Sequence, residues 1–158
     1  MKKIIKLVLA LVLIYGCFKL IRKSIKTVAE GLEHELNIYK TNFFIYKEWT
    51  QIQKEGKKVT DYLNKNNINS IAIYGAGTFA DMLLDEVKDT DIEVKYMLDT
   101  YDNKPHKGFE VISPKDINQY PEVDGIIITP VFDYLNIVQE LEKHKKDLNI
   151  ISLENLLL

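Results

Sequence analysis

The sequence predicts an α/β domain with one doubly wound, parallel sheet of five strands, preceded by a long helical region at the amino end of the chain. From Asn69 onward, short apolar runs alternate with helical patterns, which is typical of a parallel sheet covered on both faces. The run from Gly125 to Ile128 is apolar at successive positions, as expected for a strand buried on both sides. A glycine-containing turn between the first such run and the first such helix agrees with this arrangement.

Length and charge limit what the chain can be. Its 158 residues are enough for one domain with an appendage in front of it. The formal net charge is -2 and the two signs are interspersed, so no basic field exists to gather nucleic acid, and we predict no nucleic-acid partner. The lone Cys17 can form neither an internal disulfide nor, by itself, a thiolate metal site. No ligand residues show a metal spacing, and no metal is predicted.

Three segments are predicted: a transmembrane signal anchor at 1–21, an amphipathic helical segment at 22–66 and the α/β domain at 67–158. The run from Leu7 to Phe18 carries no charge, and lysines at its ends can extend it toward the length of a membrane span. The basic residues ahead of the run are Lys2, Lys3 and Lys6, and those behind it are Lys19, Arg22, Lys23 and Lys26. Because the excess follows the run, we expect a single-pass protein of the cell membrane whose carboxyl-terminal domain is cytoplasmic.

Two alternatives to this anchor stay open. Residues Ile14 to Cys17 resemble a lipobox, with a bulky Tyr15 where a smaller residue is usual, so the chain is alternatively a lipoprotein processed at Cys17. The other alternative is a plain buried helix.

The segment after the run has one apolar residue every three or four positions. These residues are Ile21, Ile25, Val28, Leu32, Leu36, Tyr39, Phe43 and Tyr46. Their mean spacing lies between about 3.5 and 3.6 residues, which favours a helical stripe. Through residues 20–54 we expect this stripe to pair with a second copy, to lie against a partner, or to pack on the body of the protein. Gly56 is predicted to end the helix, and a second short helix begins near Val59.

The elements of the domain follow from periodicity and turn residues. Strands are predicted at about 70–74, 92–98, 110–112, 124–129 and 149–151, and helices at about 78–88, 114–118, 132–145 and 153–157. The sheet order expected for this alternation is 3-2-1-4-5, which places the fourth strand beside the first.

The turn after the first strand has the spacing GxGxxA, from Gly75 to Ala80. In dinucleotide-binding turns the first glycine permits a tight turn, the second lets the backbone approach a pyrophosphate, and the third small residue lets helix and strand pack closely. The amino end of the following helix attracts anions. The predicted cofactor-binding residues of this turn are Gly75, Ala76, Gly77, Thr78 and Phe79. In the alternative interpretation the glycines serve packing alone.

Three further residues complete the predicted site. Asp99 follows the second strand about 22 residues after Gly77, where a carboxylate accepts hydrogen bonds from ribose hydroxyls. Thr129 and Pro130 end the fourth strand, beside the turn, and there Thr129 either contacts phosphate or sugar or simply ends the strand. Asp81 would repel a phosphate if it pointed at the turn, and the basic residues of the loop 100–108 either meet an anion or are solvated.

No catalytic residue is predicted. The domain has no tyrosine four residues before a lysine, no GxSxG elbow and no GxxxxGK loop. The turn thus predicts binding of a nucleotide-type ligand such as NAD(P), with no visible chemistry.

Several short stretches together resemble a Rossmann-like domain of bacterial surface-polysaccharide proteins. These stretches are Ile73 to Gly77, Leu98-Asp99, Gly108 with Val111 to Pro114, and Asp124 to Ile128. Such domains occur at the amino end of sugar acetyltransferases and of nucleoside-diphosphate-sugar epimerases or dehydratases, and similar small bacterial proteins also carry one. The resemblance implies a nucleotide or nucleotide-sugar site at Gly75, Gly77, Thr78 and Asp99, in an accessory or sensor protein of cell-envelope polysaccharide metabolism. It also implies that a partner bound through residues 20–54 would be an envelope-polysaccharide partner. The alternatives are a membrane-tethered interaction module without a ligand, and a small NAD(P)-dependent oxidoreductase or epimerase-type subunit.

Overall fold

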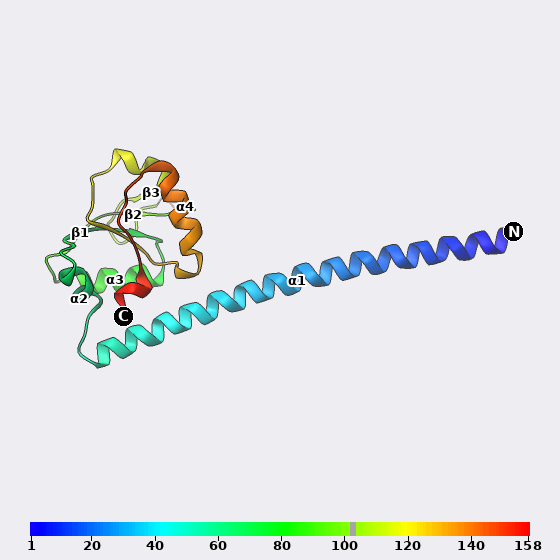
Figure 1. Cartoon of the computed structure of the whole chain (residues 1–158), viewed down its shortest axis with the longest axis horizontal. Coiled ribbons are helices and arrows are strands. Elements are labelled where there is room, and N and C mark those ends of the chain that lie inside the picture. Colours follow the sequence, from blue (N-terminus) through cyan, green and yellow to red (C-terminus); the bar gives the residue numbers. More distant parts are fainter. Residues whose placement is uncertain (102–103) are drawn as a thin grey trace. The chain divides into compact units, whose positions relative to one another are not determined.

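The computed structural model describes the backbone of residues 1–101 and 104–158, with the side chains of 3–5, 7–10, 12 and 13 left out of the description. The chain divides into two compact units, Met1–Lys40 and Thr41–Leu158 (Figure 1). The first unit consists of helix only, and the second holds the sheet.

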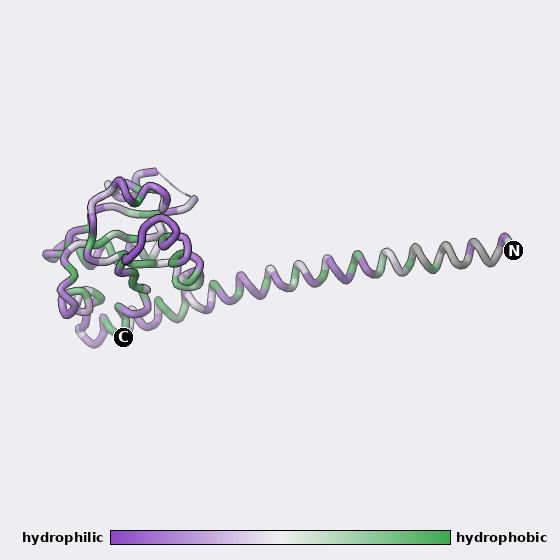
Figure 2. The backbone as a smooth tube through the Cα atoms, turned by 45° about the horizontal axis from the view of Figure 1, so that its top comes forward, coloured by the Kyte–Doolittle hydropathy of each residue, from purple (hydrophilic) through white to green (hydrophobic). Residues whose placement is uncertain are grey.

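Helix α1 (Lys2–Lys54) forms the first unit and continues into the second. The sequence predicts two segments here, and the structure has one uninterrupted helix, with Gly31 accommodated inside it. Within the part of the chain that the structure describes, no helix is both long and apolar enough to cross a membrane. Nine residues of the predicted anchor at 1–21 have side chains that are not described, and Figure 2 draws residues of uncertain placement in grey, so the anchor stays a prediction.

The second unit contains a five-stranded parallel sheet in the order β3-β2-β1-β4-β5, as the sequence predicts. The strands are β1 (Ser70–Tyr74), β2 (Glu93–Leu98), β3 (Val111–Ile112), β4 (Gly125–Ile128) and β5 (Ile150–Ser152). The α-helices are α2 (Val59–Lys65), α3 (Thr78–Val87) and α4 (Tyr134–His144). The fold is therefore a Rossmann-like α/β sheet.

Three predicted helices differ in detail. The segments predicted at 114–118 and 153–157 are the 3-10 turns η1 (Pro114–Gln119) and η3 (Leu153–Leu156), because pieces this short readily close with the tighter hydrogen bonds. The helix predicted at 132–145 begins as a 3-10 turn, η2 (Val131–Asp133), and becomes α-helical at Tyr134.

Alternate residues of each strand enter two separate cores. Ile71 and Ile73 of β1 face the core formed with α2, α3 and the end of α1. Ala72 and Tyr74 face the core formed with α4 and η1. Both faces of the sheet are thus covered, as the predicted double winding requires.

The last turns of α1 belong to the domain. Ile45, Trp49 and Ile52 are buried in the core on the α3 face. The ring of Trp49 stacks on Phe79, with 6.4 Å between centroids, and its indole nitrogen donates to Glu86. Gly56 then adopts a φ of 73°, which stops the helix where the sequence predicts its end.

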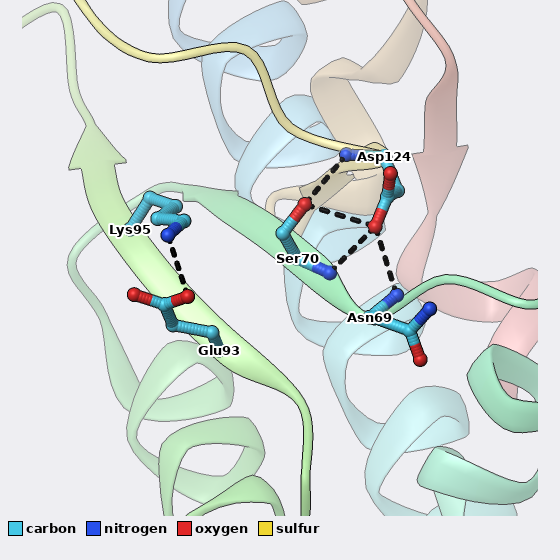
Figure 3. Close-up of polar contacts among 5 residues, drawn as sticks. All are labelled: Asn69, Ser70, Glu93, Lys95 and Asp124. Atoms are coloured by element: carbon cyan, nitrogen blue, oxygen red, sulfur yellow. Dashed lines mark hydrogen bonds and ion pairs between the residues drawn. The ribbon is translucent and has the colours of Figure 1, made fainter.

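One carboxylate joins the amino ends of two neighbouring strands (Figure 3). Asp124, just before β4, accepts hydrogen bonds from the backbone nitrogens of Asn69 and Ser70 and from the Ser70 hydroxyl. These bonds, that of the hydroxyl first, hold the pKa of Asp124 below its ordinary value. We call these contacts of Asp124 with Asn69 and Ser70 the Asp124 clamp. The clamp fixes where β1 and β4 begin, and the pairing register of the two strands then places their carboxyl ends side by side.

Candidate functional site

The candidate site lies at the opposite edge of the sheet, where β1, β2 and β4 end. The turn after β1 is held on both sides: the Gly75 nitrogen donates to the Leu98 carbonyl at 2.7 Å, and the Tyr74 carbonyl accepts from the Thr129 nitrogen at 3.0 Å. From β1 the chain adds β2 and β3 on one side of the sheet and then β4 and β5 on the other side. Ligands of open α/β sheets bind at the point where the strand order switches in this way.

The two glycines of the turn have different surroundings. Gly75 is buried with a φ of 94°, and a Cβ atom there would lie 2.7 Å from Thr129 Oγ1 and 3.0 Å from the Pro130 ring. Gly77 is exposed with a φ of -114°, and a Cβ atom there would meet nothing within 4 Å. The first glycine is therefore required by packing, whereas space is open beside the second, at the amino end of α3.

Asp99 lies against this turn, as the sequence predicts. Its Oδ2 accepts a hydrogen bond from the Ala76 nitrogen at 3.2 Å, and its Oδ1 accepts one from the Tyr101 nitrogen at 2.8 Å. The carboxylate therefore holds the backbone of the turn through one oxygen and the backbone of Tyr101 through the other.

The other predicted site residues divide into two groups. Thr78 begins α3 and is exposed next to Gly77, and Pro130 lines the crevice described below. Thr129 is 4% exposed, and its hydroxyl donates to the Tyr74 carbonyl at 2.9 Å. Phe79 packs on Trp49 in the core of the α3 face. The structure thus brings Thr78 and Pro130 to the open edge and engages Thr129 and Phe79 in packing.

Asp81 in the first turn of α3 has two basic neighbours. Its Oδ1 lies 2.6 Å from His106 Nε2 and 3.3 Å from Lys107 Nζ. The hydrogen bond with His106, assisted by Lys107, holds the pKa of Asp81 below its ordinary value. The carboxylate that the sequence identified as a source of repulsion for phosphate is thus paired with His106 and Lys107 from the loop after β2.

A crevice of about 210 Å³ opens beside the turn on the α4 face. Its lining includes Tyr74, Asp99, Thr100, Pro130, Phe132 and Glu140. The Tyr74 hydroxyl lies 2.6 Å from Thr100 Oγ1, which in turn donates to Glu140 at 3.3 Å. Burial first, and then the charges of nearby carboxylates, raise the pKa of Tyr74 to about 12, so the phenol stays protonated at neutral pH.

Sequence reasoning did not identify Tyr74, Thr100 or Glu140 as site residues. Tyr74 is the last residue of β1 and directly precedes the glycine turn, so its position was the one available signal. Thr100 and Glu140 are 40 residues apart in the chain and meet only through the fold.

The chemistry that this edge offers is recognition of a polar, anionic ligand. Open main chain at Gly77 and the helix end suit a phosphate, and carboxylates suit hydroxyl groups. Within 1–101 and 104–158, no group of three or more His, Cys, Asp or Glu side chains is placed to hold a metal ion.

Comparisons with known proteins agree with the extent of this domain. No curated protein matches the chain. A family model described as "C2185-like, N-terminal" matches residues 67–152, which span the sheet from before β1 to the end of β5. Since the match covers more than half of the 158 residues, the chain belongs to the C2185-like, N-terminal family.

Proposed function

We propose that the chain binds a nucleotide or nucleotide-sugar at the carboxyl edge of its sheet and serves as an accessory or sensor protein in cell-envelope polysaccharide metabolism. The observation that carries the proposal is the contrast between the two glycines of the turn. Packing requires glycine at the first position only, and a turn that receives a phosphate needs the free space found at the second.

Position and charge support a phosphate at this turn. Gly77 is the N-cap of α3, a helix of ten residues, so main-chain N–H groups and the positive end of the helix dipole face the open space. The nearest carboxylate on the helix, Asp81, is bound by His106 and Lys107, which offsets its repulsion of an anion.

The neighbouring groups suit the rest of such a ligand. Asp99 lies beside the turn, at the position where the carboxylate of a dinucleotide-binding domain accepts hydrogen bonds from ribose hydroxyls. The crevice on the α4 face, with Glu140 and the exposed ring of Phe132 at its lining, suits a hydroxyl-rich group. The alternative ligand, NAD(P), shares the diphosphate and the pentose.

The test is calorimetry on the full chain in detergent micelles, titrated separately with UDP-sugars, NAD, NADP, coenzyme A and S-adenosylmethionine. We expect at least one nucleotide to bind. Gly77→Val should weaken that binding at least about tenfold, because the backbone there accepts a side chain but the ligand and the side chain need the same space. Gly31→Val is the matched control, because it also adds a valine in open space, on α1.

Failure of every nucleotide to bind at millimolar concentration would contradict the proposal. Equal binding by Gly77→Val and the unmodified chain would remove the turn from the site even if a nucleotide bound.

We propose further that residues 1–21 hold the chain in the cell membrane with the domain in the cytoplasm, on the charge distribution around the apolar run. Protease added to intact cells should leave a carboxyl-terminal tag uncut. Incorporation of a labelled fatty acid that Cys17→Ser abolishes would instead establish the lipoprotein alternative.

A further inference from the structure

Helix α1 carries a continuous apolar stripe, which we define as Ile21, Ile25, Val28, Leu32, Leu36, Tyr39, Phe43 and Tyr46. Every one of these side chains is exposed, from 51% at Leu36 to 71% at Tyr39 and Phe43. Apolar side chains that repeat at this spacing over so many turns are typical of a helix that packs against another helix.

The domain uses a different side of the same helix. Ile45, Trp49 and Ile52 are buried in the domain core, whereas Phe43 and Tyr46, from the same turns, are exposed. With 3.6 residues per turn, the centre of the stripe lies about 130° around the helix axis from the centre of the buried set. Within the second unit, the packing of Ile45, Trp49 and Ile52 therefore leaves Phe43 and Tyr46 of the stripe exposed.

The stripe offers apolar area on the scale of an interface. Aromatic side chains can bury about 150–250 Å² each, and Tyr39, Phe43 and Tyr46 are 56–71% exposed, so in two copies these three positions alone offer roughly 800 Å², to which the five aliphatic side chains add. Stable and specific interfaces bury about 1,200–2,000 Å² in total.

We propose that the stripe is the seam of a parallel homodimer, in which α1 of one copy pairs with α1 of a second copy. From Ile21 to Leu32, and again from Leu36 to Tyr46, the stripe follows the alternating steps of three and four residues of a coiled coil. The step from Leu32 to Leu36 adds one extra interval of four, a stutter that locally unwinds the supercoil without breaking the seam.

Charges beside the seam select the parallel orientation. The flanks are the two rows of residues that border the stripe on either side. In a parallel pair, a residue on one flank faces the residue five positions later on the other flank of the partner. Glu35 therefore lies opposite Lys40 of the second copy. Both side chains are exposed, and symmetry produces this attractive pair twice. The remaining facing pairs, Ser24 with Ala29 and Asn42 with Lys47, contain no like charges.

An antiparallel pair would lose this advantage. Like flanks then face each other, so Arg22 meets Lys47 of the other copy and two cations oppose each other. Glu35 meets Gly31 and gains no partner. A parallel pair also places both amino ends together, as two chains anchored in one membrane would require.

Disulfide trapping in the full chain tests the proposal. Two variants, Ile25→Cys and Phe43→Cys, are each combined with Cys17→Ser, so that each chain has a single cysteine. Each variant is expressed separately, and intact host membranes that contain it are oxidised with copper phenanthroline. A parallel dimer brings each position next to its own copy, so each variant should form a product of twice the chain mass. Glu30→Cys, on the opposite side of α1, is the matched control and should form little.

Other outcomes would overturn the proposal. An antiparallel dimer would trap neither single variant and would trap only a mixture of Ile25→Cys and Phe43→Cys chains. A product of any other mass would identify a different partner. If only monomer formed in membranes that contain the chain in excess, the stripe would not be a seam.

A charge-exchange series tests the orientation independently. Glu35→Lys and Lys40→Glu should each weaken the dimer about two- to fivefold by sedimentation equilibrium in detergent, because like charges then face each other. The double variant should recover the original affinity, since the attractive pair is restored with its signs reversed. Failure of the double variant to recover would contradict the parallel register.

Discussion

A Cβ atom at Gly75 would lie 2.7 Å from the hydroxyl oxygen of Thr129, which itself donates to the carbonyl of Tyr74. The glycine also has a φ of 94°, a conformation that side chains rarely adopt. Gly75→Ala should therefore lower the free energy of unfolding by about 1–3 kcal/mol, measured by urea denaturation followed by circular dichroism.

Gly77→Ala is the control for this prediction. The same change two residues later meets no atom within 4 Å and no unfavourable φ, so it should change stability by no more than about 0.5 kcal/mol. Equal losses at the two glycines would contradict the difference that we see between them.

Trp49 should anchor the end of α1 to the domain. Its side chain is fully buried, stacks on Phe79 and donates to the Glu86 carboxylate, so Trp49→Ala should cost about 3–5 kcal/mol of stability. Lys47→Ala, an exposed change on the same turn, should cost no more than about 0.5 kcal/mol.

A direct optical readout accompanies this test. The chain has one tryptophan, so fluorescence of the unmodified protein reports on this site alone. The emission should shift to longer wavelength in the same urea transition that removes the circular dichroism signal. A fluorescence change well before that transition would mean that the end of α1 separates from an intact domain.

Gly31→Ala should stabilise α1. Glycine inside a helix costs about 1 kcal/mol relative to alanine, and a Cβ atom at Gly31 meets nothing within 4 Å in the single chain. The variant should retain its helical circular dichroism to a higher temperature than the unmodified chain. Loss of helix signal would contradict the continuous α1.

The sheet was largely predictable because its signals are local. The apolar run of β1 ends at a glycine, and the predicted strand has the same ends as the observed one, Ser70 and Tyr74. The glycine turn and Asp99 were also placed correctly beside each other, since the ends of neighbouring parallel strands lie at one edge of the sheet.

The contacts that complete the site were not predictable in this way. Asp81 pairs with His106, 25 residues away, and Tyr74 contacts Thr100, 26 residues away. Such pairs depend on how loops cross the end of the sheet, and no spacing rule encodes this. Thr129 shows the same limit, because only the structure reveals that its hydroxyl bonds to the backbone of β1.

Asp124 should make the stability of the domain depend on acid. Its carboxylate accepts three hydrogen bonds from Asn69 and Ser70, which lower its pKa in the folded chain below the ordinary value of 3.8 (Figure 3). Because the folded pKa is the lower one, this contribution is complete only well above the unfolded pKa, from about pH 5, and is lost as the pH falls through the folded pKa. Asp124→Asn should therefore reduce stability at pH 7 and lose less additional stability than the unmodified chain between about pH 4 and pH 2.

Urea midpoints across this range measure both effects, and Glu122→Gln, an exposed carboxylate two residues earlier, serves as the control. If the stability of Asp124→Asn and of the unmodified chain fell equally over this pH range, the ionised carboxylate of Asp124 would not contribute to joining the amino ends of β1 and β4.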